Sequence, residues 1–346
     1  MMIVQSNQTP NISALREFAW EKQQSMKIVL PTMITLSILG IAANCIICYA
    51  IIKKKELRAV TYYLMINMAI SDCLILAVLS CIEGINYYLT DHVASTPLLV
   101  AFCKILGYFN SISYHASTCT LAAISIERYY ILSSAAIHHP SFFNTASKLR
   151  LMIGYSWLAG FIIAMPSIIV YGIDINYPYS CSIGFISPSF NIPYFITVFI
   201  VLLVVPSIII IIMYGKIIRY LYKNVSNNDR RHTLSQGFKN NRQHQRNTIK
   251  MLVLVTASFT ISCYPIFLAY ISVSIQRQST AKYLYENRLR ASIISKFMII
   301  TYTLPCILHP LIYLHYNRSI RGALIDCCRY GHTPSSSIAP ANSSKE

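Results

Sequence analysis

The residues of this sequence best suited to charge chemistry stand next to one another: Glu127, Arg128 and Tyr129. They end a largely apolar stretch that begins at Cys103. As a helix rising roughly 1.5 Å per residue, this stretch is about 38 Å long and can cross a bilayer. Charged groups near a membrane span are costly, so the pair of opposite charges favours a functional role. The alternative is an ordinary helix end, at which Arg128 extends to the lipid headgroups.

A second set of polar residues lies in the middle of apolar runs, where a side chain needs a partner because lipid offers none. The set consists of Asn44, Asp72, Ser117 and His309. One interpretation is a shared polar cluster at the centre of a helix bundle. The other is that each side chain bonds separately to a backbone carbonyl, which suits Asn44 and Ser117 taken alone. A mid-span aspartate is harder to explain in that way, so Asp72 indicates a functional site.

Patterns typical of catalysis or metal binding are absent from the sequence. It has no Gly-rich phosphate loop, no catalytic triad spacing and no Cys/His spacing typical of zinc. We therefore expect no enzyme, no metal and no cofactor. Most of the 11 cysteines lie in apolar runs, where a reduced thiol behaves as a small hydrophobe. Cys103 and Cys181 instead lie at span edges on the predicted outer side, where an oxidising compartment permits a disulfide.

The composition indicates a membrane protein. Of the 346 residues, 55% are hydrophobic and 12% are charged, whereas a soluble domain has about 25% charged residues. The net charge of +17 comes from Lys and Arg on the predicted loops. In a membrane protein this balance reflects charge bias toward the cytoplasm and contact with anionic lipid, so we expect no nucleic-acid partner.

The apolar runs predict an all-α membrane protein, a bundle of seven transmembrane helices within residues 28–316. Lys53, Lys54 and Lys55 follow the first run in a short loop, which places that loop inside and the N-terminus outside. Prolines within the fourth to seventh runs predict kinks. The predicted spans are residues 28–52, 60–89, 103–130, 151–171, 192–214, 247–275 and 291–316.

Two features are predicted on the outer side. Residues 1–27 are mixed and polar, and they carry the glycosylation sequons of Asn7 and Asn11, which fits a short extracellular tail. Alternating and aromatic residues around Cys181 predict a short hairpin.

Two features are predicted on the inner side. Residues 317–330 gather apolar side chains on one face, which predicts an amphipathic helix on the membrane surface. Cys327 and Cys328 near its end are candidate palmitoylation sites. The Ser-rich residues 331–346 are expected to form a disordered cytoplasmic tail.

Short motifs follow one another along the spans in a characteristic order. They are Gly40 to Asn44, Asn67 to Asp72, Cys103 with Cys181, Glu127-Arg128-Tyr129, Trp157, Pro206 with Tyr214, Phe259 with Pro265, and Pro310 to Tyr313. In these motifs the chain, from about residue 28 to residue 328, resembles the rhodopsin-like (class A) G-protein-coupled receptors. Each motif is weak alone, and their order makes the resemblance specific. It implies a disulfide between Cys103 and Cys181.

The resemblance also implies a mechanism. An extracellular ligand at the plasma membrane would favour a state in which the inner end of the sixth span swings outward. Arg128 would then leave Glu127 and help to form a crevice for a heterotrimeric G protein. Tyr129 completes the triplet, while Tyr214 and Tyr313 would turn inward beside Arg128.

Three departures from the family pattern matter. Tyr264 stands where relatives usually have a tryptophan, so other contacts must couple the ligand to the core. His309 stands where relatives have Asn or Asp, and we hypothesise that His309, sometimes protonated, replaces the sodium ion often found beside the span-two aspartate. Arg246 lies where some relatives place an acid that pairs with the triplet arginine, so Arg128 lacks a second partner and basal activity should be raised.

The ligand is predicted to be a peptide. Asn110 replaces the aspartate typical of amine receptors, and Thr303 stands where an opsin needs its lysine. The Cys-Lys opening of the third span resembles peptide receptors. If the spans face as in relatives, the outer pocket is lined by Glu83, Asn110, Tyr114, Phe267, Tyr270 and Lys296.

Some alternatives stay open at this level. Glu83 and Lys296 could hold opposite charges of a peptide, or Glu83 could pair with Lys104. A small non-peptide ligand fits the same motifs. A transporter or channel would use Asp72 and His309 as an ion or proton path.

Overall fold

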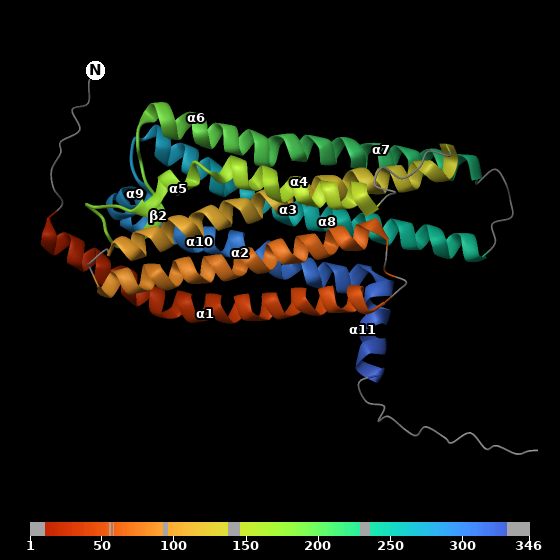
Figure 1. Cartoon of the computed structure of the whole chain (residues 1–346), viewed down its shortest axis with the longest axis horizontal. Coiled ribbons are helices and arrows are strands. Elements are labelled where there is room, and N and C mark those ends of the chain that lie inside the picture. Colours follow the sequence, from red (N-terminus) through yellow and green to blue (C-terminus); the bar gives the residue numbers. More distant parts are fainter. Residues whose placement is uncertain are drawn as a thin grey trace, which may run out of the picture.

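The computed structural model describes residues 11–54, 57, 59–92, 96–137, 146–228 and 236–330. Within these ranges it describes the backbone, but not the side chains, of residues 132–137, 221–228, 236–242, 244–245, 289–292, 294–295, 298 and 327–330. Most of the described chain is helical, and the long helices run side by side along one axis (Figure 1).

The elements follow one another in a simple order along the chain. They are α1 (Ile12–Lys53), α2 (Val60–Asp91), α3 (Pro97–Ile137), α4 (Ala146–Ala164), α5 (Ser167–Val170), β1 (Tyr171–Ile173), β2 (Cys181–Ile183), α6 (Pro188–Phe199), the π-helix η2 (Ile200–Val204), α7 (Val205–Asn228), α8 (Gln236–Ile275), α9 (Thr280–Glu286), α10 (Arg288–Tyr316) and α11 (Arg318–Tyr330).

Four described helical stretches are long and apolar enough to cross a membrane: Ile12–Lys53, Val60–Asp91, Pro188–Tyr220 and Arg246–Ile275. The helices α3, α4 and α10 lie in the same bundle. Helix α3 carries serines, threonines and tyrosines between its apolar residues.

Helix α1 begins earlier than the first apolar run. Asn11 caps it, because its Oδ1 accepts a hydrogen bond from the backbone N–H of Ser13 at 3.0 Å. Residues 12–27, which the sequence analysis placed in a tail, therefore continue α1 as helix. Good helix formers such as Glu, Lys, Gln, Met and Ala fill this segment, and they support a helix without making it apolar.

Two proline positions refine the predicted kinks. The fourth span does not continue through Pro166, because α4 ends at Ala164 and Pro166 precedes the short α5. The wide turn η2 comes immediately before α7, in which Pro206 is the second residue. Proline has no N–H to donate, and a local widening of the helix is one way to accommodate it.

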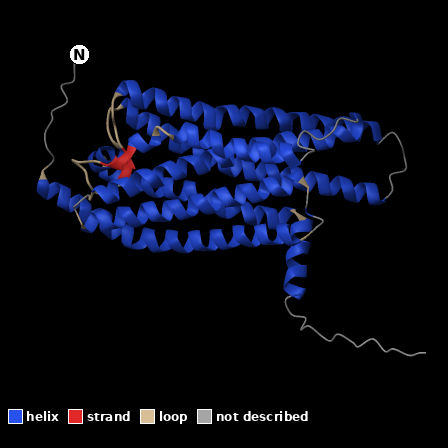
Figure 2. Ribbon diagram, viewed as in Figure 1, coloured by secondary structure: helices blue, strands red, loops and turns tan. Residues whose placement is uncertain are grey.

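The predicted hairpin is present. Strands β1 and β2 pair antiparallel, with Tyr171 opposite Ile183 and Ile173 opposite Cys181. Cys181 forms a disulfide with Cys103 of α3, which fastens the hairpin to the bundle. The strands lie at the end of the bundle where α1 begins, and α11 lies at the other end (Figure 2).

The core brings the helices together at close approaches. Gly40 of α1 lies so near to α2 and α10 that an added Cβ would be 2.7 Å from Leu76 and 3.0 Å from Ile307. Asn67 of α2 donates to Thr120 of α3 at 2.7 Å. It also accepts a hydrogen bond from the indole of Trp157 in α4 at 2.9 Å. This amide therefore joins three helices.

Candidate functional site

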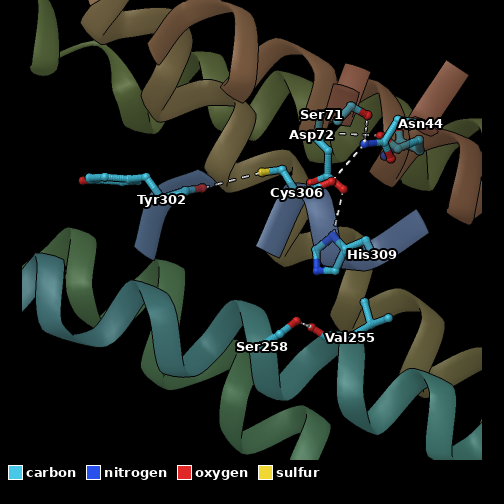
Figure 3. Close-up of polar contacts among 10 residues, drawn as sticks. Asn44, Ser71, Asp72, Val255, Ser258, Tyr302, Cys306 and His309 are labelled. Atoms are coloured by element: carbon cyan, nitrogen blue, oxygen red, sulfur yellow. Dashed lines mark hydrogen bonds and ion pairs between the residues drawn. The ribbon is translucent and has the colours of Figure 1, made fainter. Parts of the chain in front are cut away.

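The mid-span acid has a partner from the other end of the sequence. His309 Nδ1 of α10 lies 2.7 Å from Asp72 Oδ2 of α2, and both side chains are 0% exposed. Figure 3 shows the two side chains pointing toward each other, with Asn44 beside them. The bundle thus places a hydrogen-bonded acid and base where water does not reach. The second oxygen of Asp72 and Nε2 of His309 have no hydrogen-bond partner among the described residues.

The other two members of the predicted cluster are placed differently. Asn44 donates to the carbonyls of Gly40 and Cys306, each at 2.9 Å, so it joins α1 to the backbone of α10 next to the pair. Ser117 is fully buried, and in the described structure its hydroxyl has no hydrogen-bond partner. The structure therefore brings Asp72 and His309 into contact, whereas Asn44 is hydrogen-bonded to backbone carbonyls.

The charged triplet lies toward the end of α3 that is nearer α11. Glu127 is buried, while Arg128 and Tyr129 are half-buried. The ionisable neighbours that act electrostatically on Arg128 are Tyr62, Tyr214 and Glu127. Its Nε has no hydrogen-bond partner among the described residues.

The two predicted switch tyrosines are both buried. Tyr214 is 8% exposed, and Tyr313 is 1% exposed. Tyr214 acts electrostatically on Arg128 and also on Tyr313. Tyr214 therefore lies close to both Arg128 and Tyr313.

A chain of rings runs from the half of the bundle that carries the hairpin to the buried pair. Tyr302 and Tyr114 have ring centroids 5.3 Å apart, and Tyr114 lies 6.0 Å from Phe259. Phe259 in turn stacks on the imidazole of His309 at 6.5 Å. Tyr264, which replaces the family tryptophan, packs instead against Phe199 of α6 at 5.5 Å.

A large cavity opens at the end of the bundle that carries the hairpin. Its volume is about 580 Å³, and four predicted pocket residues line it: Glu83, Asn110, Tyr270 and Lys296. The other two, Tyr114 and Phe267, line an adjoining cavity of about 40 Å³ that shares Asn110 and Tyr270 with the first. Glu83 accepts a hydrogen bond from Asn86 at 3.2 Å and interacts electrostatically with Lys22, rather than with Lys104.

Sequence reasoning missed several residues that line the large cavity. Tyr171 and Tyr302 belong to this group, and their aromatic side chains within or at the end of a predicted span are the signal that could have found them. Phe18, Lys22 and Arg288 also line it. No pattern marked Phe18 and Lys22, because they lie in a segment that is polar overall.

Several predicted features fall elsewhere. Asn7 and the tail 331–346 lie outside the described residues, as do the side chains of Cys327 and Cys328. Asn11 is exposed at the start of α1. Among the described residues, no group of three or more His, Cys, Asp and Glu side chains is placed to hold a metal ion.

Comparisons with known proteins identify the family. The profile described as "7 transmembrane receptor (rhodopsin family)" matches residues 43–313. The mouse protein "Probable G-protein coupled receptor 19" is 27% identical over 247 residues, covering 68% of this chain and 53% of its own. Rat "Neuropeptide FF receptor 1" is 26% identical over 250 residues, with 68% and 55% covered. The "Cholecystokinin receptor" of Xenopus laevis is 24% identical over 361 residues, with 87% and 76% covered.

The chain spans about half the length of the first two of these relatives. The family profile, by contrast, covers most of the chain and includes the triplet, the buried pair and the disulfide. The chain therefore belongs to the rhodopsin family of seven-transmembrane receptors, a class of receptors and not of enzymes.

Proposed function

We propose that this protein binds an extracellular ligand in the large cavity and activates a heterotrimeric G protein at the opposite end of the bundle. The observation that carries the proposal is the arrangement along α3. Asn110 in this helix lines the cavity, and Arg128 follows five turns later beside Tyr214. One helix thus carries both a ligand contact and a G-protein contact.

The membrane topology is part of the proposal. Seven spans place the N-terminus and the disulfide-linked hairpin outside, and they place Arg128, the basic loops and α11 inside. The long apolar helices support membrane crossing, and the basic residues Lys53, Lys54 and Lys55 after the first span support this orientation. The plasma membrane is the expected location, and α11 is expected to lie on its inner surface.

The ligand is proposed to be a peptide. Two of the relatives described above carry the names of peptide receptors, at identities of 26% and 24%. The cavity supports the proposal because it combines an apolar surface with charged groups such as Glu83 and Lys296. Ligand pockets of drug size commonly measure roughly 300–1,000 Å³, so a small non-peptide ligand is the alternative.

Coupling from the cavity to the inner side is proposed to follow the rings. A ligand that moves Tyr302 acts on Tyr114, and through Phe259 it acts on the imidazole of His309. A change at His309 alters its contact with Asp72 and the packing of α10 against α2. In this proposal, the row of rings couples the ligand to the core in place of the tryptophan of relatives, because this chain has Tyr264 at that position.

The test is a second-messenger screen against a neuropeptide library in transfected cells, followed by Arg128→Ala. We expect a ligand to evoke a signal in the parent protein, and we expect Arg128→Ala to abolish that signal while leaving binding of the same peptide within about twofold, because the arginine does not line the cavity. Arg150→Ala is the matched control, since Arg150 is an exposed arginine of α4. Undiminished signalling from Arg128→Ala would refute the assignment, and a substrate-coupled current without a second-messenger response would indicate a transporter instead.

A further inference from the structure

The first turns of α1 cross the outer end of the bundle and contact the hairpin. The ammonium of Lys22, which is half-buried, donates a hydrogen bond to the carbonyl oxygen of Tyr179 at 2.6 Å. Tyr179 comes two residues before Cys181, the hairpin residue that is bonded to α3. The start of α1 is therefore tied to the most firmly anchored outer loop.

Arg288, at the start of α10, holds the same segment from the other side. Its guanidinium lies 3.3 Å from the carboxylate of Glu17 and 3.7 Å from that of Glu21. It also donates to the backbone carbonyl of Ala14 at 2.9 Å. One arginine thus contacts α1 at three points on successive turns. We refer to Arg288, Glu17 and Glu21 as the clamp.

Aromatic rings complete the junction above the clamp. The ring of Phe18 meets Tyr285 at 5.5 Å and Tyr179 at 6.4 Å, and the guanidinium of Arg288 lies 6.0 Å from Phe18 and 5.6 Å from Tyr285. Tyr177 packs on Tyr285 at 5.1 Å. Burial, and then nearby acidic and phenolic groups, raise the pKa of Tyr177 above its ordinary value, so this phenol is neutral at physiological pH.

The segment held in this way is a wall of the large cavity. Phe18, Glu21, Lys22 and Met26 all line it, and Met33 continues the same wall deeper in α1. Residues of α2, α8 and α10 form the other sides. Without the start of α1, the cavity would be open toward the outer side of α2 and α10.

The charges around the cavity are not balanced. Glu21 is paired with Arg288, and Glu83 interacts with Lys22. The remaining charged group that lines it is Lys296, which is exposed and has no ion pair within the described part of the chain. An anionic ligand group can pair with Lys296 without disturbing another pair, whereas a cationic group near Glu83 would meet the positive charge of Lys22.

We propose that residues 12–27 of α1 are a wall of the ligand site, held over the cavity by the clamp, and that this site takes a peptide with an apolar body and an anionic group, either an acidic side chain or a free carboxyl terminus. The apolar body lies against Met26 and Met33, and the anionic group lies at Lys296. The proposal deepens the function given above and rests on it for the identity of the cavity as the ligand site.

The wall can be tested without a ligand. Val273 of α8 lines the cavity and is 8% exposed, so Val273→Cys, a nearly isosteric change, places a reporter thiol inside it. The probe is sulfonatoethyl methanethiosulfonate, an anionic reagent that does not cross membranes, applied to whole cells. The control site is Ile275→Cys, because Ile275 is 60% exposed near the end of the same helix and does not line the cavity. The protein without either new cysteine gives the background from the native thiols.

Opening the clamp should expose the reporter. We expect Arg288→Ala to speed modification of the reporter by about tenfold, and Glu17→Gln with Glu21→Gln to do the same, with no change at the control site. The first variant removes a positive charge and the second removes negative charges, so a shared increase cannot come from electrostatic attraction of the reagent. Charge reversal at all three positions (Glu17→Arg, Glu21→Arg and Arg288→Glu) should restore slow modification in a folded, surface-expressed protein. Equal rates of reporter modification in the parent and in both opened variants would overturn the proposal that the clamp holds residues 12–27 over the cavity.

The charge preference is tested at the same reporter with a cationic reagent, the trimethylammonium-ethyl analogue. After normalisation to the control site, the anionic reagent should react about fivefold faster than the cationic one, since the reagents differ by two unit charges near Lys296. Lys296→Gln should remove most of this preference. A normalised ratio of the anionic to the cationic modification rate at or below one would overturn the proposal that the ligand carries an anionic group. Neither result depends on G-protein activation, so failure here is distinct from failure of the Arg128→Ala test.

Discussion

At the scale of single residues, the contact between Asp72 and His309 is the most consequential. A buried carboxylate is stable only with a partner, and here the imidazole supplies it at 2.7 Å with both groups away from solvent. Since the imidazole lies where a cation would otherwise balance the acid, the geometry supports the hypothesis that His309 replaces a sodium ion.

Sodium should therefore have little effect on this protein. We expect equal thermal stability of the purified protein in sodium chloride and in choline chloride. His309→Asn should be destabilised by about 3–5 kcal/mol in choline chloride, because it leaves the acid unpaired, and sodium should restore part of that loss. His115→Asn is the control, since His115 is also buried but has no acid partner given by the structure. Sodium-dependent stabilisation of the parent protein would contradict the hypothesis.

Gly107 is a second residue whose identity is fixed by contact. A Cβ built on it would lie 2.2 Å from the ring of Tyr171, which lines both cavities. Gly107→Ala should therefore displace this ring and destabilise the protein by about 1–3 kcal/mol, as overpacking does. Gly154→Ala is the matched control, because nothing lies within 4 Å of its added Cβ and alanine favours helix. Thermal unfolding in detergent measures both, and a Gly107→Ala protein as stable as the control would show that Tyr171 moves aside freely.

At the scale of elements, the first turn of α11 and an ion pair between Lys54 and Asp326 help to hold this helix to the bundle. Asn317 caps it, with Oδ1 accepting from the N–H groups of Ser319 at 3.1 Å and Ile320 at 3.2 Å. Lys54, just after α1, lies 2.6 Å from Asp326 of α11. The ion pair is partly exposed and contributes little, so the cap and the buried Ile320 dominate.

Removing the cap should loosen α11 alone. Asn317→Ala is expected to cost about 1 kcal/mol of local stability and to speed amide hydrogen exchange in α11 about fivefold, with the rest of the bundle unchanged. Asn287→Ala is the matched control, because Asn287 precedes α10 without a side-chain capping bond. Hydrogen exchange read by mass spectrometry separates the two helices. Unchanged exchange in α11 would mean that packing, and not the cap, fixes its start.

At the scale of the whole molecule, the end of the bundle that carries the hairpin is assembled from distant parts of the chain. The disulfide joins residues 78 positions apart and fixes the hairpin between α3 and the start of α1. Asn86 of α2 adds to this, since its Oδ1 accepts a hydrogen bond from the N–H of Cys181 at 2.8 Å. The same contacts shape the cavity.

Loss of the disulfide should therefore lower the stability of the whole protein. Replacing both cysteines, Cys103→Ser with Cys181→Ser, is expected to cost about 4 kcal/mol, because a loop of this length is freed in the unfolded chain. Reductant should lower the unfolding temperature of the parent protein and leave that of the double variant unchanged. Cys81→Ser, at an exposed free cysteine of α2, serves as the control. A double variant as stable as this control would show that the hairpin is held by its other contacts.

Local signals in the sequence were enough for the long apolar helices, the hairpin and the family. The order of motifs around Asp72, Arg128 and Pro310 indicated a rhodopsin-like bundle, and the family profile agrees. The alternating and aromatic residues around Cys181 predicted the hairpin, and the family resemblance implied its disulfide with Cys103; the structure contains both. These features depend on neighbours in the chain, or on motifs whose spacing is fixed by helix length.

Only the tertiary structure decided which distant side chains meet. The sequence placed Asp72 and His309 in the same polar core, but their contact joins residues 237 positions apart and depends on how α2 and α10 face each other. It placed residues 12–27 in a tail, because hydrophobic periodicity does not distinguish a polar helix from a polar loop. That segment became a wall of the cavity through Arg288 and the hairpin, and such long-range contacts leave no local pattern in the sequence.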